Sequence, residues 1–371
     1  MKVTMLVSGF PSSQGGAERQ IEFLAPLLAQ RGIELSIVAR AHPDSRAAFE
    51  HAAVHHVAVG GGRVVAAIGF AAGAVRCIRD IRPDIIHAHG LLSPATAAVL
   101  AGRSLRTPVV AKVLLGGENG EVGRLLAWRR GGPIRMRALR ATIDRFVVIS
   151  REIDEELRDV GVPAGRRVLI PNGVDTSRFH PSSGEVRRTS RERLGFGKGP
   201  IVLFVGRLHP QKGVAVLLEV WAGVRRSCPT AKLVIVGDGG LRAAFEESAP
   251  EGVDFVGKVH DVLPYLASAD VFVLPSMAEG LSNALLEAMA CGLAVVATDV
   301  GATAYVLGDA GRIVDPGDAM ALERELIDLL ADSDLRARLG ARARERVGEG
   351  YKLADTADRL VALYDSVLDA H

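Results

Sequence analysis

The sequence predicts an α/β protein made of two doubly wound parallel-sheet domains. The chain has 371 residues, which is too long for one compact hydrophobic core. Short apolar runs alternate with stretches of helical periodicity, and this alternation stops at a polar segment near residue 180 and then begins again. Ligands of such sheets bind beyond the carboxyl ends of the strands, so we expect a deep cleft between the two domains to hold them.

The first half of the chain carries the first series of alternating elements. Its expected helices span residues 17–31 and 64–81, and Gly32 ends the first of them. Apolar runs predict strands at 3–8, 34–39, 84–87, 107–115, 146–150 and 167–171. We assign residues 1–183 to this N-terminal domain.

The second half repeats the pattern after a polar, arginine-rich linker at 176–199. Strands are expected at 201–205, 232–236, 253–256, 271–274 and 294–298, with helices at 214–226, 241–248, 262–267 and from residue 283. We assign residues 184–354 to this C-terminal domain. A helix at about 355–371 is expected to pack back onto the N-terminal domain.

Composition and charge restrict the class of protein. The chain is 48% hydrophobic and 24% charged, as is typical of a soluble globular protein. Its three cysteines lack metal-ligand or disulfide spacing, and residues 1–7 are too short for a signal segment. We therefore expect a cytoplasmic protein, or one that lies peripherally on the inner face of the cell membrane. No motif indicates a nucleic-acid partner.

The stretch 276–292, SMAEGLSNALLEAMACG, combines a loop and a helix that together suit a nucleotide. Ser282 can cap the helix, whose N-terminus can bind a phosphate. Glu287 lies about 7 Å along the helix axis, which matches the span from a diphosphate to the ribose hydroxyls. Glu279, in the loop, could hold hydroxyls beyond the phosphates. The alternative is a surface glutamate beside an unrelated helical one.

Two further motifs in the first half admit two interpretations each. Gly15 and Gly16 stand between a strand and a helix, where backbone N–H groups can approach a phosphate, although a simple turn has the same sequence. His87 and His89 share one face of a strand. They could bind a metal, but no third ligand lies nearby in the sequence, and hydrogen-bonded histidines at a strand end are the other interpretation.

A cluster of six arginines marks the end of the first half. Residues 1–180 hold 24 Lys+Arg against 16 Asp+Glu, a balance of +8, whereas 181–371 hold 21 against 27, a balance of −6. Trp128 and Met136, which could enter an interface, lie among the clustered arginines. These are Arg124, Arg129, Arg130, Arg135, Arg137 and Arg140. The cluster is either a solvated helical face or a patch, Arg124–Arg140, that meets an anionic membrane surface.

The motifs taken in order resemble those of the retaining glycosyltransferases of family 4. The resemblance covers about residues 3 to 317. It rests on the Gly15-Gly16-Ala17-Glu18 loop, the Pro171–Asp175 turn, the stretch from Phe204 to Gly213, and the Glu279…Glu287 pair. It implies the GT-B fold, in which two Rossmann-like domains face each other. Residues 1–183 would then be the acceptor-side domain and residues 184–354 the donor-binding domain.

The resemblance also implies residue roles. Arg207 and Lys212 would hold the donor diphosphate, Glu279 the donor sugar and Glu287 the ribose, while residues 257–262 would line the base pocket. The remaining donor-binding residues would be Gly15, Gly16, Gly206, Gly237, Val259, His260, Gly280, Leu281, Ser282 and Asn283. Sugar or acceptor contacts could come from His89, Glu118 and Asn172. The chain departs from the family at Leu114, where a histidine is usual, and at Tyr305, where a glutamate is usual.

The expected function is transfer of a hexose from a UDP- or GDP-sugar to an acceptor, with retention of configuration. The acceptor could be a small molecule, a glycan or a glycolipid, and a lipid-linked precursor of cell-surface polysaccharide suits the basic half. No metal or other cofactor is expected, since Arg207, Lys212 and two helix N-termini can stabilise the leaving diphosphate. The Asp332-Ser333-Asp334 triplet fits a helix cap better than a metal site. The alternatives are a nucleotide-sugar epimerase and a catalytically silent partner subunit that binds nucleotide sugar.

Overall fold

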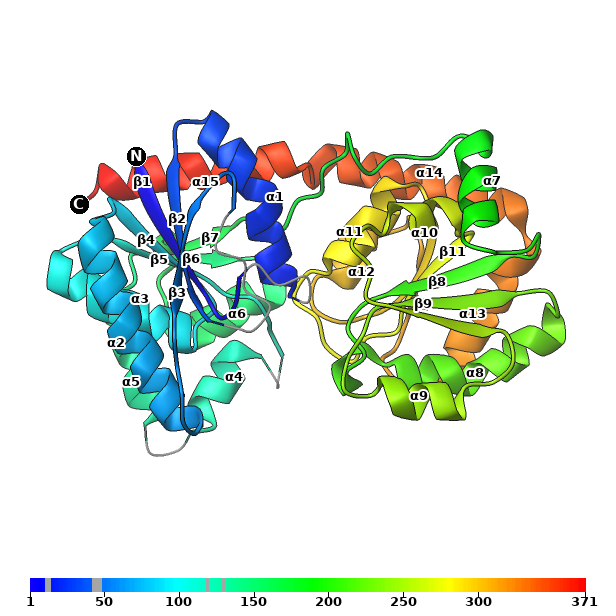
Figure 1. Cartoon of the computed structure of the whole chain (residues 1–371), viewed down its shortest axis with the longest axis horizontal. Coiled ribbons are helices and arrows are strands. Elements are labelled where there is room, and N and C mark those ends of the chain that lie inside the picture. The colour runs from blue at the N-terminus through cyan, green and yellow to red at the C-terminus, as the bar shows by residue number, and fades with distance from the viewer. Residues whose placement is uncertain (11–14, 42–48, 118–119, 129–130) are drawn as a thin grey trace. The chain divides into compact units, whose positions relative to one another are not determined.

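The computed structural model describes residues 1–10, 15–41, 49–117, 120–128 and 131–371, apart from the side chains of Arg63 and Val64. The chain divides into two compact units. Unit 1 contains Met1–Asn172 together with Leu353–His371, and unit 2 contains Gly173–Lys352. The chain therefore passes into unit 2 after Asn172, before the expected boundary at 183/184, and its C-terminal helix belongs to unit 1 (Figure 1).

Unit 1 is built on a parallel sheet whose described strands follow the order β3-β2-β1-β4-β5-β6-β7 (Figure 1). The direction of strand addition reverses at β1, which makes the sheet doubly wound. The strands are β1 Lys2–Val7, β2 Glu34–Arg40, β3 Ala53–Val57, β4 Ile85–His89, β5 Val109–Lys112, β6 Arg145–Val148 and β7 Arg167–Leu169.

Helices cover both faces of this sheet. On one face a core of apolar residues joins the sheet to α1 and to the C-terminal helix α15, where Leu24 and Leu360 are buried. On the other face Gly102 of α3 approaches the strands so closely that a Cβ would lie 2.5 Å from Val109 Cγ2. The helices are α1 Gly16–Gln30, α2 Arg63–Ile81, α3 Ser93–Leu105, α4 Glu121–Leu126, α5 Gly132–Thr142, α6 Arg151–Asp159 and α15 Leu353–Leu368.

Unit 2 repeats the plan with a parallel sheet in the order β10-β9-β8-β11-β12-β13. The prediction of two doubly wound, Rossmann-like parallel sheets is thus confirmed. Trp221 of α8 and Leu326 of α13 lie in the core against one face of this sheet. The strands are β8 Ile201–Val205, β9 Lys232–Val236, β10 Val253–Gly257, β11 Val271–Leu274, β12 Ala294–Thr298 and β13 Arg312–Val314.

The helices of unit 2 include one that the sequence analysis placed in a linker. Residues 184–193 form α7, which packs on α10. Arg187 and Arg191 of α7 both pair with Asp270, at 2.6 Å each, so this segment is part of the fold of unit 2. The helices are α7 Gly184–Arg193, α8 Val214–Ser227, α9 Arg242–Ser248, α10 Leu263–Ser268, α11 Asn283–Ala290, α12 Thr303–Leu307, α13 Ala319–Ala331 and α14 Ser333–Gly350.

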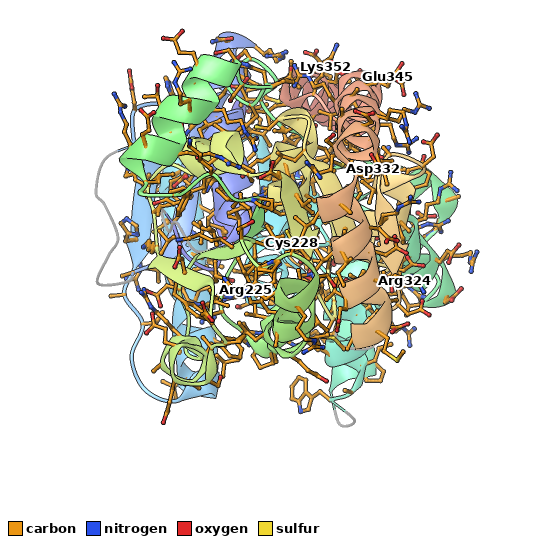
Figure 2. The ribbon with its side chains drawn as sticks, turned by 90° about the vertical axis from the view of Figure 1, so that its right-hand side faces the viewer. Arg225, Cys228, Arg324, Asp332, Glu345 and Lys352 are labelled. Atoms are coloured by element: carbon orange, nitrogen blue, oxygen red, sulfur yellow. The ribbon has the colours of Figure 1, made fainter. Side chains whose placement is uncertain are left out.

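The predicted helix cap at Asp332 can be checked directly. Asp332 stands at the turn between α13 and α14 (Figure 2), and its side chain accepts a 2.8 Å hydrogen bond from the Leu335 N–H, which confirms the helix-cap interpretation. Among the described residues no helix combines the length and the apolar character needed to cross a bilayer.

Candidate functional site

Helix α11 begins at the carboxyl edge of the unit 2 sheet, directly beyond the loop that follows β11. Ser282 caps it, since its Oγ accepts a hydrogen bond of 3.4 Å from the Leu285 N–H. This confirms the predicted cap. Glu287, one turn into the helix, is only 3% exposed. A buried carboxylate near a helix N-terminus is suited to bind hydroxyl groups beside a phosphate, as expected for a ribose.

Lys212 and Glu279 come from different loops and form an ion pair. Lys212 ends the short 3₁₀ helix η2 Pro210–Lys212 after β8, whereas Glu279 lies in the loop after β11. Glu279 is 7% exposed, and its Oε1 also accepts a hydrogen bond of 2.7 Å from Ser276 Oγ. The two loops are joined further by Gln211, whose side chain donates to the Ala278 carbonyl at 2.9 Å.

Glycines allow the other loops of this edge to approach one another. Gly213 has φ +65°, and a Cβ there would lie 1.8 Å from the Pro275 carbonyl oxygen. Gly301, with φ +58°, would place a Cβ 2.2 Å from the Glu279 carbonyl oxygen. Gly237, with φ +139°, packs in the same way on the Gly206 carbonyl. Backbone contacts therefore fix the position of the loops that carry Lys212 and Glu279.

The remaining residues expected around the donor lie on the same edge of unit 2. Arg207 follows β8 and is exposed, and within the described residues nothing pairs with its guanidinium. Val259 and His260 follow β10 and are at least partly exposed. The following residue, Asp261, pairs with Arg178 at 3.0 Å. A basic side chain, a helix N-terminus and buried carboxylates thus lie together, which is the arrangement needed to bind a phosphate and hydroxyl groups.

The carboxyl edge of unit 1 is also polar, but its groups are buried. His89 ends β4 and Lys112 ends β5, and the two are register neighbours. Lys112 donates a 2.8 Å hydrogen bond to Asn172 Oδ1 and is 3% exposed. His87 contacts the hydroxyl of Tyr364 in α15 at 2.7 Å. Neither ring nitrogen of His89 has a hydrogen-bond partner among the described residues.

Burial changes the protonation of these groups. It lowers the pKa of Lys112, whose hydrogen-bond partner Asn172 is neutral, to about 8. Burial, reinforced by Lys112, lowers the pKa of His87 to about 3. It also depresses the pKa of His89 well below its usual value, with His87 and Lys112 adding to the effect. Both histidines are therefore neutral at pH 7, and the described residues contain no group of three potential metal ligands.

Not every residue of the sequence analysis takes the expected position. Gly15 and Gly16 do take theirs, since Gly15 precedes α1 as its N-cap and Gly16 is the first residue of that helix. Met136 is 4% exposed and belongs to the core, so the expectation that it could enter an interface is wrong. Arg135 is bound within unit 1, since it donates to Thr96 Oγ1 at 2.6 Å. Glu118, Arg129 and Arg130 lie outside the described residues.

Sequence reasoning missed several residues that the structure brings to the two edges. Ser276 and Gln211 hold the Lys212–Glu279 pair, but neither belongs to a recognisable motif. Lys112 was detectable, because it is a single charge inside the apolar run Val109-Val110-Ala111-Lys112-Val113. Its partner Asn172 was named as a possible sugar or acceptor contact, and not as a partner of Lys112.

Comparisons with known proteins agree with this arrangement. Residues 14–178 match the model of Glycosyltransferase Family 4, and residues 199–332 match that of Glycosyl transferases group 1. The chain is 30% identical over 379 residues to a phosphatidyl-myo-inositol mannosyltransferase of Mycolicibacterium smegmatis, a match that covers 96% of this chain and 91% of that protein.

A second relative and a solved structure extend the comparison. A GDP-mannose-dependent monoacylated alpha-(1-6)-phosphatidylinositol monomannoside mannosyltransferase of Corynebacterium glutamicum is 34% identical over 211 residues, which span 53% of this chain and 55% of that protein. The fold is similar to that of Anabaena HepE in complex with UDP and glucose, with a TM-score of 0.83 and 19% identity over 99% of this chain and 100% of that one. The chain belongs to the family 4 glycosyltransferases, which have the GT-B fold.

Proposed function

We propose that this glycosyltransferase moves a hexose from a nucleoside-diphosphate donor, bound at the carboxyl edge of unit 2, to a lipid acceptor. The observation that carries the proposal is the Lys212–Glu279 pair beside the capped N-terminus of α11. A diphosphate entering there would meet the Lys212 ammonium, the exposed Arg207 and the helix N-terminus. Glu279 would then accept hydrogen bonds from the sugar, and Glu287 from the ribose.

The relatives favour GDP-mannose as the first donor to test. The Corynebacterium glutamicum relative is GDP-mannose-dependent by name, and both relatives act on phosphatidylinositol-type lipids by name. UDP-sugars remain the second choice, because HepE binds UDP and glucose with a similar fold.

The arrangement supports a retaining, metal-independent reaction. Negative charge builds up on the diphosphate as it leaves, and a fixed positive clamp lowers the energy of that transition state. Lys212 and Arg207 can supply this charge without a metal. The leaving phosphate can itself take the proton of the acceptor hydroxyl on the face from which it departs, and this keeps the configuration of the sugar.

A membrane-facing surface on unit 1 is also proposed. We call the described residues Arg124, Leu126, Trp128, Ile134 and Arg137 the α4–α5 surface. Trp128 is 60% exposed and Ile134 73% exposed, and both arginines of this surface are exposed. Exposed aromatic and aliphatic side chains beside arginines suit the interface of an anionic bilayer, where each basic residue contributes about 1 kcal/mol. A lipid acceptor in the same membrane would then be presented to unit 1 of the bound enzyme.

The donor assignment can be tested with purified protein and nucleotide sugars. We expect GDP-mannose and GDP to raise the melting temperature more than the UDP and ADP counterparts. Transfer to phosphatidylinositol in mixed vesicles should follow, should persist in EDTA and should give an α-linked product. Interconversion of the donor sugar without any transfer would instead indicate an epimerase. A melting temperature that responds to no nucleotide would refute the donor site.

The membrane surface can be tested by co-sedimentation with vesicles of phosphatidylcholine and phosphatidylglycerol. The double variant Trp128→Ser/Ile134→Ser should bind these vesicles more weakly than the wild type. Met320→Ser, at an 85% exposed apolar residue of unit 2, is the matched control and should bind as the wild type does. Equal binding by all three proteins at ~0.15 M salt would rule out the α4–α5 surface as the membrane contact.

A further inference from the structure

Glu121 joins two loops at the carboxyl edge of unit 1. It is the first residue of α4 and is buried. Its Oε1 accepts a 3.1 Å hydrogen bond from the Leu91 N–H, in the loop after β4. Its Oε2 accepts a 2.8 Å hydrogen bond from the Leu114 N–H, in the loop after β5. One carboxylate therefore fixes the distance between the two loops.

Arg135 of α5 holds the first of these loops from the carbonyl side. Its Nη2 donates to the Leu92 carbonyl and to Thr96 Oγ1 in the first turn of α3. Glu121 takes the N–H of Leu91 and Arg135 takes the C=O of the next residue. The loop is thus held by two charged side chains of opposite sign, one from α4 and one from α5.

The close fit of Glu121 depends on a glycine in the held loop. Gly90 has φ +108°, and a Cβ there would lie 2.8 Å from Glu121 Oε1. Any other residue at this position would be strained and would push the carboxylate away from the loop. Gly90 thus permits the contact that Glu121 makes.

The burial of Glu121 has an energetic cost. Burial raises its pKa to about 7, although the two N–H groups and Arg124 on the same helix act in the opposite direction. Two further cations contact the described residues around this loop: Arg135 is engaged with Leu92 and Thr96, and Arg40 donates a 2.8 Å hydrogen bond to Ser93 Oγ. A glutamate in the first turn of a helix interacts favourably with the helix dipole even when it is exposed. The dipole therefore does not explain why Glu121 is buried. The buried position serves the two loops.

We propose that Glu121 and Arg135 are positioning residues for the acceptor, because they set the loops after β4 and β5 at the edge where a doubly wound sheet binds its ligands. The inference rests on the proposed function, in which unit 1 serves the acceptor. Neither residue is expected to touch the donor, whose proposed charged contacts Arg207, Lys212 and Glu287 lie in unit 2. A loss of either should therefore affect transfer and leave nucleotide binding intact.

The test uses Glu121→Gln, which keeps the shape but turns one acceptor oxygen into a donor that faces an N–H. We expect kcat for transfer to fall on the order of 10-fold or more, because small misplacements of reacting groups are costly. The affinity for GDP should be unchanged. The wild-type pH profile of kcat should show a group with a pKa of about 7 that is required ionised, and the variant should lose it. Glu155→Gln, at an exposed position of α6, is the matched control.

Amide hydrogen exchange at Leu91 and Leu114 is the second readout and does not depend on any acceptor. Faster exchange in Glu121→Gln, together with the lower kcat, supports the proposal. Unchanged exchange would show that Glu121 does not hold the two loops. Faster exchange with a wild-type kcat and pH profile would show that holding them does not position the acceptor. If the wild type transfers no sugar at all, the proposed function fails. The exchange rates still decide whether Glu121 holds the two loops. Arg135→Gln should speed exchange in the first loop and leave Leu114 unaffected.

Discussion

The basic side chains at the carboxyl edge of unit 2 are paired or exposed, whereas those at the carboxyl edge of unit 1 are buried. In unit 2 the Lys212 ammonium pairs with Glu279, and Arg207 is exposed to solvent. In unit 1 the Lys112 ammonium is buried and has the neutral Asn172 as its partner. The neighbouring His89 is buried and neutral.

This difference separates two uses of polar residues. A paired lysine near solvent keeps its charge and can exchange its partner for a phosphate, which suits binding and departure of a nucleotide. Buried groups with shifted pKa values order the backbone around them and make the fold sensitive to pH. We therefore expect changes at Lys212 and Arg207 to affect turnover and nucleotide binding, and changes at Lys112 to affect the pH dependence of stability.

The largest effect is expected from the basic residues of unit 2. Lys212→Ala or Arg207→Ala should lower kcat on the order of 100-fold, because each removes positive charge that stabilises the leaving diphosphate. Steady-state kinetics with saturating donor measure this. Lys198→Ala, at an exposed lysine outside the site, is the control. Wild-type rates in both site variants would remove these residues from the donor clamp.

The close packing of the unit 2 loops should contribute to the free energy of unfolding. Gly213→Ala would bring a Cβ against the Pro275 carbonyl in a backbone region that alanine disfavours, so we expect a loss of about 2 kcal/mol in the free energy of unfolding. Urea denaturation measures the loss. Gly197→Ala, where a Cβ would meet no atom within 4 Å, should change stability far less. Similar values for the two variants would mean that the contact between these loops is not tight.

A smaller effect is expected for Glu287→Gln. The change removes the negative charge that would accept hydrogen bonds from ribose hydroxyls, so free GDP should bind about 10-fold more weakly. Isothermal titration calorimetry of the nucleotide, with guanine base alone as the comparison, measures this directly. The weakening should be absent for the base, which has no ribose. An unchanged GDP affinity would show that Glu287 does not bind the ribose.

The subtlest effect concerns Lys112 and pH. Its pKa falls from 10.5 to about 8 on folding, so between these values the unfolded chain binds the proton more tightly. The free energy of unfolding should therefore rise with pH in this window, by at most about 1.4 kcal/mol per pH unit from this group. Lys112→Met should lack this rise, whereas Lys198→Met should retain it. Parallel stability curves for wild type and Lys112→Met from pH 7.5 to 10 would show that folding does not lower the pKa of Lys112.

Local patterns in the sequence were sufficient for much of the fold. The alternation of apolar runs and helical stretches placed most strands of both sheets, because strand burial and helix periodicity depend on residues close in sequence. The caps at Ser282 and Asp332 were predicted for the same reason, since each involves residues three positions apart. The expected strand at 107–115 was too long, and only Val109–Lys112 pair in the sheet.

Other features depended on contacts between distant parts of the chain. Strand β3 was missed because its two histidines weaken the apolar pattern, and it is recognised only by its pairing with β2. Helix α7 was predicted to be a polar linker. Its arginines pair with Asp270, which lies about 80 residues away in the sequence, and local sequence does not show these ion pairs.

The roles of the ionisable residues were decided in the same way. The pairing of Lys212 with Glu279 joins residues 67 positions apart, and the contact of His87 with Tyr364 joins residues 277 positions apart. The sequence by itself determined the two sheets and the loops at their edges. Only the tertiary structure decided which charges are paired and which are buried, because burial and pairing depend on neighbours that local sequence does not specify.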